Sequence, residues 1–148
     1  MERIERIHFL SRADKLKPVR DVVRELAQRQ GCTKENLDCM VMAINEACMN
    51  VIQHAYAEDD NGEIILEFWK DNDDLVIRIY DFADKVDKSK IKSRDLDDIK
   101  PGGLGVHLIH KVMDKVEYVD MPNEPGNLLE MRKQIGDEKI CETPCKEK

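Results

Sequence analysis

A glutamate and an asparagine stand one helical turn apart in a stretch of the chain that is almost free of charge. Between Cys39 and Ala57 the only formal charge is Glu46, although 37% of all residues are charged, and Asn50 follows four residues later. In a helix this spacing places both side chains on one face. A carboxylate in a dry site suits a general base, and an amide oxygen suits Mg²⁺. Glu46 is therefore a candidate base and Asn50 a candidate metal ligand; the alternative is a partly solvated polar face with an incidental pair.

A second candidate is Asp81, which ends a predicted strand over 75–80 and is followed closely by Ala83. An acid at a strand end that faces a cleft can accept a hydrogen bond from an exocyclic amine such as that of adenine. The alternative is an aspartate that only forms a turn. Both interpretations stay open from this residue alone.

A third candidate is the glycine-rich segment that opens a predicted helix, with Leu104 between Gly102, Gly103 and Gly105. Glycine permits close approach of the backbone, and the free N–H groups of a first helical turn favour an anion. The segment therefore predicts a phosphate site; the alternative is a glycine-rich helix start after a loop. The preceding 83–101 stretch is strongly polar, and such long loops are usually functional lids or disordered.

Hydrophobic periodicity predicts the elements that must position these residues. Strands are predicted over 4–10, 63–70, 75–80, 115–121 and 128–135, and helices over 18–30, 33–57 and 104–113. The central helix has Thr33 as its N-cap and an apolar stripe on the side opposite Glu46. This order predicts helices gathered on one face of a mostly antiparallel sheet, which is a two-layer α/β sandwich.

The composition suits one domain over residues 1–135, and the charged segment over 136–148 is expected to be a disordered tail. A net charge of −7 argues against nucleic acid or an anionic membrane as the main partner. No apolar run approaches the roughly 20 residues of a membrane span, and the N-terminus is no signal peptide. The expected location is therefore the cytoplasm, with the five cysteines reduced.

The combined motifs resemble those of a known family. The segment INEACMNVIQHAY, 44–56, resembles the N-box of the ATPase superfamily shared by gyrase, heat-shock chaperones, histidine kinases and MutL. The segment RDLDDIKPGGLGVHLIHKVMDKVEY, 94–118, resembles the lid and second glycine box of a bacterial branch, the anti-sigma-factor serine kinases. The resemblance covers about residues 5–135 and implies the two-layer histidine-kinase-like (Bergerat) fold, with a mixed, mostly antiparallel sheet.

The resemblance also implies roles for individual residues. Glu46 matches the catalytic base, Asn50 the Mg²⁺-binding amide, and Asp81 the aspartate that reads the adenine of ATP. The other positions that match nucleotide-binding segments of the family are Ala83, Gly102, Gly103, Leu104, Gly105 and Asn127.

In function, the resemblance implies an ATP- and Mg²⁺-dependent serine kinase of a partner-switching pathway. Such kinases phosphorylate a small STAS-domain anti-anti-sigma protein, bind a sigma factor in a competing complex, and form homodimers. Two positions depart from the family pattern: Lys85 replaces a glycine of the first glycine box, and Leu128 replaces a hydrogen-bonding residue. These departures favour the alternative, a non-catalytic module that binds a sigma factor or a STAS protein.

Overall fold

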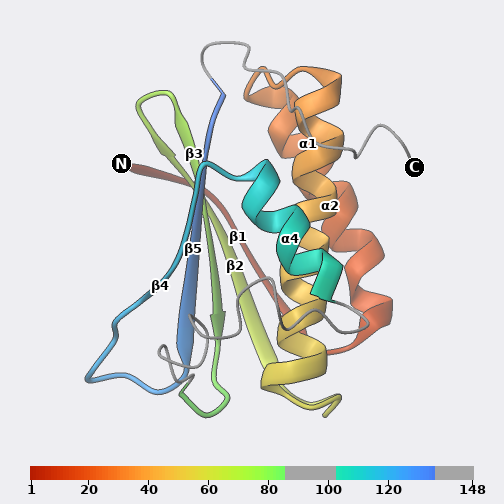
Figure 1. Ribbon diagram of the computed structural model, residues 1–148, viewed down its shortest axis with the longest axis vertical. Coiled ribbons are helices and arrows are strands. Elements are labelled where there is room, and N and C mark those ends of the chain that lie inside the picture. Colours follow the sequence, from red (N-terminus) through yellow and green to blue (C-terminus); the bar gives the residue numbers. More distant parts are fainter. Residues whose placement is uncertain (86–102, 136–148) are drawn as a thin grey trace.

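The chain is described by a computed structural model that covers residues 1–85 and 103–135 (Figure 1). Its elements, in chain order, are β1 (Glu2–Leu10), η1 (Ala13–Lys15), α1 (Leu16–Arg29), α2 (Lys34–Asn50), η2 (Val51–Ala55), β2 (Glu63–Asp71), β3 (Asp74–Asp81), α4 (Gly103–Val112), β4 (Lys115–Val119) and β5 (Asn127–Gln134). Each predicted strand and helix is present, with ends that differ by only a few residues.

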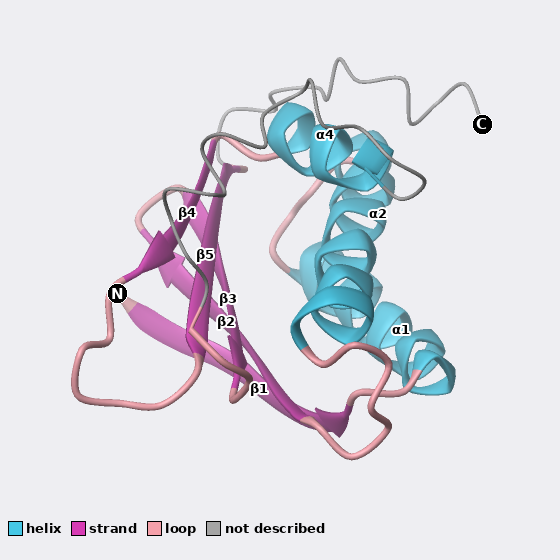
Figure 2. Cartoon of the chain, turned by 60° about the horizontal axis from the view of Figure 1, so that its bottom comes forward, coloured by secondary structure: helices cyan, strands magenta, loops and turns pink. Residues whose placement is uncertain are grey.

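The five strands form one sheet in the order β1-β2-β3-β5-β4. Every pairing among these strands is antiparallel, where the family resemblance allowed a mixed sheet. The helices α1, α2 and α4 lie together on one face of the sheet, as Figure 2 shows. The predicted two-layer α/β sandwich is therefore confirmed.

The central helix α2 forms where its cap and its apolar stripe predict it. The Thr33 side chain accepts a hydrogen bond from the Asn36 backbone N–H at 3.2 Å, which satisfies a free donor of the first turn. The apolar stripe is buried at Leu37, Met40, Val41, Ile44, Ala47, Cys48, Val51 and Ile52. The predicted helix over 33–57 is α-helical only to Asn50, because 51–55 form the π-helical turn η2. Such turns are rare and occur often at functional sites.

The core lies between α2 and the helix-facing side of the sheet. Alternate residues of β2, β3 and β5 supply it, and each is at most 1% exposed: Ile64, Leu66, Phe68, Leu75, Ile77, Ile79 and Met131. Burying such a side chain contributes about 1.5–3 kcal/mol to the free energy of unfolding. This packing holds the ends of β3 and β5 at fixed positions relative to α2.

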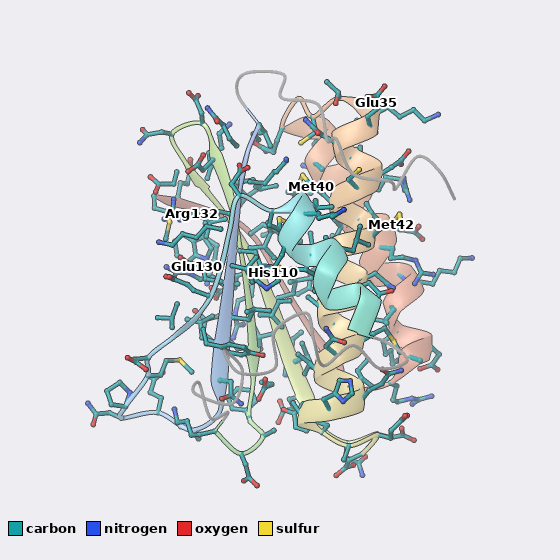
Figure 3. The ribbon with its side chains drawn as sticks, viewed as in Figure 1. Glu35, Met40, Met42, His110, Glu130 and Arg132 are labelled. Atoms are coloured by element: carbon teal, nitrogen blue, oxygen red, sulfur yellow. The ribbon has the colours of Figure 1, made fainter. Side chains whose placement is uncertain are left out.

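The opposite face of the sheet carries charged side chains among apolar ones such as Val76 and Leu128. Glu130 and Arg132 of β5 point away from the helices there (Figure 3). The Arg78 guanidinium lies 2.8 Å from the Glu130 carboxylate and 5.3 Å from the centre of the Trp69 ring. Opposite charges that face each other across neighbouring strands stabilise a sheet, and Glu130 is only 8% exposed in this pair.

The cysteines correct one expectation. Cys32 and Cys48 carry free thiols, as predicted, but Cys39 of α2 is disulfide-bonded, and neither of those two is its partner. A single cysteine inside an apolar stripe gives no sign of a disulfide, since burial alone explains it.

Several sequence predictions fall beyond the described residues: most of the lid, Gly102, and the tail at 136–148. Among the helices that are described, none has the length and apolar character needed to cross a membrane.

Candidate functional site

Asp81 is the last residue of β3, and its side chain faces the helices. The residue is 4% exposed. Its Oδ1 accepts two hydrogen bonds, one from the Asn127 side chain at 2.9 Å and one from the Ala83 backbone N–H at 3.0 Å. Burial raises the pKa of the Asp81 carboxyl above its ordinary value of 3.8, while these two hydrogen bonds lower it. No hydrogen bond from another described residue reaches Oδ2, so one oxygen of a buried acid remains for a ligand.

Asn127, the first residue of β5, contacts two residues of the site, Asp81 and Asp84. It pairs with Asp81 across the β3–β5 ladder, and its Nδ2 donates both to Asp81 Oδ1 and to the Asp84 carbonyl oxygen at 3.0 Å. The neighbouring Gly126 has a φ of +83°, and a Cβ there would collide with the Asp81 carbonyl oxygen. The segment after β3 is therefore held closely against the start of β5.

Lys85 stands where the family resemblance predicts a glycine, and its side chain lies toward the connection between β4 and β5. Its Nζ donates to the Met121 carbonyl oxygen at 2.8 Å. Together with residues 118–122 and 126–128 it lines a cavity of about 200 Å³. Ligand pockets usually measure about 300–1,000 Å³, so this cavity is at most one end of a larger site.

The second departure, Leu128, belongs to the other side of the sheet. It pairs with Tyr80, whereas Asp81 pairs with Asn127. Because successive side chains of a strand alternate between faces, Leu128 points away from the helix-facing side that carries Asp81. Its lack of a hydrogen-bonding group therefore removes nothing from the vicinity of Asp81.

Glu46 and Asn50 lie one turn apart in the last two turns of α2, and both are partly buried. Beside them, Asn45 accepts a hydrogen bond from Arg20 of α1 at 2.9 Å, which ties this part of α2 to its neighbouring helix. Within the described chain, neither the Glu46 nor the Asn50 side chain forms a hydrogen bond or an ion pair with another residue. Their proposed roles as base and metal ligand stay predictions, and the described residues leave their polar atoms unengaged.

The helix α4 begins at Gly103, close to the predicted start at Leu104. It packs against α2 and begins beside the C-terminal half of that helix, where Asn50 lies (Figure 1). The backbone of Gly103, Leu104 and Gly105 forms its first turn. The N–H groups of such a turn have no partner inside the helix and favour an anion.

The described residues fit a divalent cation only if a ligand brings most of the coordination. No cluster of three or more His, Cys, Asp or Glu that could hold a metal occurs among them. Asn50 offers one hard oxygen with Glu46 one turn away, which suits a Mg²⁺ that keeps its waters and binds phosphate oxygens.

A comparison with known families decides the classification. A sequence model described as the histidine kinase-like ATPase domain matches residues 9–133, which is most of the chain. The chain belongs to the histidine kinase-like ATPase family.

Relatives within this family are similar over most of their length. The serine-protein kinase RsbW of Bacillus subtilis is 32% identical over 131 residues, covering 82% of this chain and 79% of that protein. RsbW of Halalkalibacterium halodurans is 35% identical over 123 residues, covering 78% of this chain and 73% of that protein. The chain is thus an RsbW-like member of the ATPase family.

Solved structures share the fold. The RsbU and RsbW domains of Rv1364c from Mycobacterium tuberculosis align with a TM-score of 0.62 at 15% identity, over 89% of this chain and 33% of that one. The chain therefore spans one third of that polypeptide. The histidine kinase domain of the blue-light activated kinase EL346 from Erythrobacter litoralis aligns with a TM-score of 0.55 at 12% identity, covering 85% and 62%.

Two features of the site were not assigned from the sequence. Tyr56 is the last residue of the N-box-like segment, and its residue type alone indicates no role. The signal that could have drawn attention to it is its position directly after the last apolar residues of the predicted helix. The close approach of Gly126 to Asp81 was also missed, although a glycine in PNEPGN is a normal sign of a positive φ.

Proposed function

We propose that this chain is an ATP- and Mg²⁺-dependent protein serine kinase of a partner-switching pathway. Its phosphate acceptor is a serine on a STAS-domain anti-anti-sigma protein, and in a competing complex it binds and inhibits a sigma factor. The observation that carries the proposal is Asp81, a buried carboxylate with one oxygen bonded to Asn127 and Ala83 and the other left for a ligand. The similarity to RsbW kinases supports the choice of substrate class.

Three side chains divide the work of binding and transfer. Asp81 Oδ2 accepts a hydrogen bond from the exocyclic amine of adenine, since Oδ1 is already occupied. Asn50 contributes an amide oxygen to Mg²⁺, which neutralises phosphate charge when bound. Glu46 accepts the proton of the substrate serine while the hydroxyl oxygen of that serine attacks the γ-phosphorus of ATP. The bond between the γ-phosphorus and the oxygen that bridges it to the β-phosphate breaks, and ADP leaves.

The phosphate groups are bound by backbone atoms in this proposal. The first turn of α4, at Gly103, Leu104 and Gly105, offers N–H groups beside the half of α2 that carries Asn50. Gly102 precedes this turn in the sequence and belongs to the same proposed loop. The Asp84 carbonyl oxygen accepts a hydrogen bond from Asn127, which holds the segment that contains Ala83 against the start of β5.

Thermal unfolding with nucleotide tests the binding part of the proposal. A ligand present at 100 times its Kd stabilises the folded state by about 2.7 kcal/mol. We expect Mg-ATP to raise the Tm, ATP with a metal chelator to raise it less, and Mg-GTP to leave it unchanged. The absence of any shift at millimolar Mg-ATP would contradict the proposal.

A second candidate is a non-catalytic module that binds a STAS protein or a sigma factor. Lys85 favours it, because a lysine stands where family members have a glycine and its side chain lines the small cavity. Incubation with labelled ATP and a co-encoded STAS protein separates the two candidates. A labelled serine supports the kinase, whereas a stable complex without label supports the module.

A further inference from the structure

The hydroxyl group of Tyr56 joins the end of the central helix to two strands. It donates a hydrogen bond to the Glu63 carbonyl oxygen at 2.6 Å and accepts one from the Phe82 backbone N–H at 2.7 Å. Glu63 opens β2, and Phe82 directly follows Asp81 at the end of β3. One phenol therefore connects the helix that carries Glu46 and Asn50 to the segment that carries Asp81.

The local backbone is shaped to bring the Tyr56 ring to this position. The π-helical turn η2 ends one residue before it, and the Tyr56 N–H bonds to the Val51 carbonyl oxygen. Ala57 and Glu58 then take positive φ values of 49° and 69°, which are uncommon for residues other than glycine. Backbone in such regions persists where surrounding contacts hold it, and it is concentrated at functional sites.

Gly62 provides the surface on which the ring rests. A Cβ at Gly62 would lie 2.5–2.6 Å from three ring carbons of Tyr56, closer than side chains approach each other. The ring thus lies directly on the glycine backbone just before β2. Contact on one side and two hydrogen bonds at the hydroxyl fix the helix end against the sheet.

We infer that Tyr56 is a positioning residue for the reaction. By bonding the Phe82 N–H, it sets the position of Asp81 relative to Glu46 and Asn50, and hence the span between the adenine and phosphate ends of the nucleotide site. Both of its partners are backbone atoms, so the connection acts on the placement of whole segments. This inference rests on the proposed function, because it names which residue aligns the two halves of that site.

Tyr80 offers a matched control on the same strand as Asp81. By strand alternation its side chain lies on the face of the sheet opposite Asp81, the face that also carries Arg78 and Glu67. Tyr56→Phe and Tyr80→Phe each remove one hydroxyl from a partly buried ring and keep the ring in place. Only the first removes a bond to the segment that carries Asp81.

Two measurements test the inference. For Tyr56→Phe we expect the KM for ATP to rise about tenfold, the change that about 1.4 kcal/mol of binding free energy produces, with kcat within about twofold of wild type. Tyr80→Phe should leave both constants unchanged. If Tyr56 had only a structural role, Tyr56→Phe would lower the amount of active enzyme and leave the KM for ATP unaltered. That result would overturn the inference.

Hydrogen exchange of the Phe82 amide gives an answer that needs no nucleotide. We expect this amide to be protected in wild type and in Tyr80→Phe, and to exchange at least about tenfold faster in Tyr56→Phe. Equal protection in all three proteins would overturn the inference. If wild type fails to bind Mg-ATP while the amide responds as expected, the proposed function fails and the connection made by Tyr56 stands.

Discussion

Asn127 Nδ2 donates a hydrogen bond to Asp81 Oδ1 at 2.9 Å. The two residues are paired directly across the β3–β5 ladder. The same Nδ2 lies 3.0 Å from the Asp84 carbonyl oxygen. One amide therefore orients the acid that we propose reads adenine and also holds the segment that follows β3.

Replacing Asn127 by alanine should weaken nucleotide binding more than it weakens the fold. Loss of a partner for a buried polar group lowers the free energy of unfolding by about 1–3 kcal/mol. Without the amide, Asp81 loses one of its two donors and its fixed orientation, so the Kd for Mg-ATP should rise at least about tenfold. Calorimetric titration and urea unfolding measure the two quantities. Asn123→Ala, at an exposed position of the β4–β5 connection, is the control and should change neither.

Asp81→Asn should abolish ATP binding and yet raise the Tm at neutral pH. Burial raises the pKa of this carboxyl above 3.8, so at neutral pH the folded state holds a charge that its surroundings disfavour. An asparagine oxygen can still accept the bonds from Asn127 and Ala83. The stability that Asp81→Asn gains over wild type is complete above the pKa of Asp81 in the folded state and shrinks as the pH falls through that pKa. It disappears below 3.8, where Asp81 is protonated in both the folded and the unfolded state.

Thermal unfolding from pH 7 downward measures this effect. Asp73→Asn, in the exposed turn between β2 and β3, is the control and should show a constant difference from wild type. A wild type that is more stable than Asp81→Asn at pH 7 would show that the charge is well accommodated, contrary to this account.

Two glycines with similar φ values should respond differently to alanine. Gly31 has a φ of +87°, and a Cβ added there would have nothing within 4 Å, whereas a Cβ at Gly126 meets the Asp81 carbonyl oxygen. Gly31→Ala should lower the free energy of unfolding by about 1–2 kcal/mol, because alanine disfavours the positive φ. Gly126→Ala should lower the free energy of unfolding by about 1–3 kcal/mol more than Gly31→Ala does, because the backbone at Gly126 or Asp81 must shift to make room for the Cβ. Denaturant unfolding of both variants checks the order, and equal losses would show that β5 can move away from Asp81.

The two free thiols in the described part of the chain should differ in reactivity. Cys48 is fully buried, and burial raises the pKa of its thiol to about 12, so almost no thiolate forms near pH 8. Cys32 is only partly buried, although burial also raises the pKa of its thiol. In the folded protein iodoacetamide should modify Cys32 first and Cys48 only after unfolding. Peptide mass spectrometry with and without urea measures this, and early modification of Cys48 would indicate an opening of α2.

The sequence predicts the fold well because periodicity reports burial. The stripe from Leu37 to Ile52, the alternation in β2 and β3, and the cap at Thr33 each follow from local pattern. The arrangement around Asp81 could not be predicted in the same way. The hydrogen bond between Asp81 and Asn127 joins residues 46 positions apart, and the one between Lys85 and Met121 joins residues 36 positions apart. The direction of a long side chain depends on which residues folding places beside it, and local sequence does not give this.

The two departures from the family pattern show the same limit. From the sequence alone, Lys85 and Leu128 count equally against nucleotide binding. In the folded sheet both residues line the small cavity, but strand alternation directs the Leu128 side chain to the face opposite Asp81. The register of β5 against β3 makes this distinction, and pattern alone does not provide it.

The most direct test of the central claim is the rate of phosphate transfer by Glu46→Gln. Intact-mass measurement of a co-encoded STAS protein, incubated with Mg-ATP and kinase, gives that rate. Because a general base contributes about 10²–10⁴-fold, we expect a loss of that size with Mg-ATP affinity retained, while Glu25→Gln on the exposed side of α1 behaves as wild type. Turnover by Glu46→Gln at the wild-type rate would contradict the account.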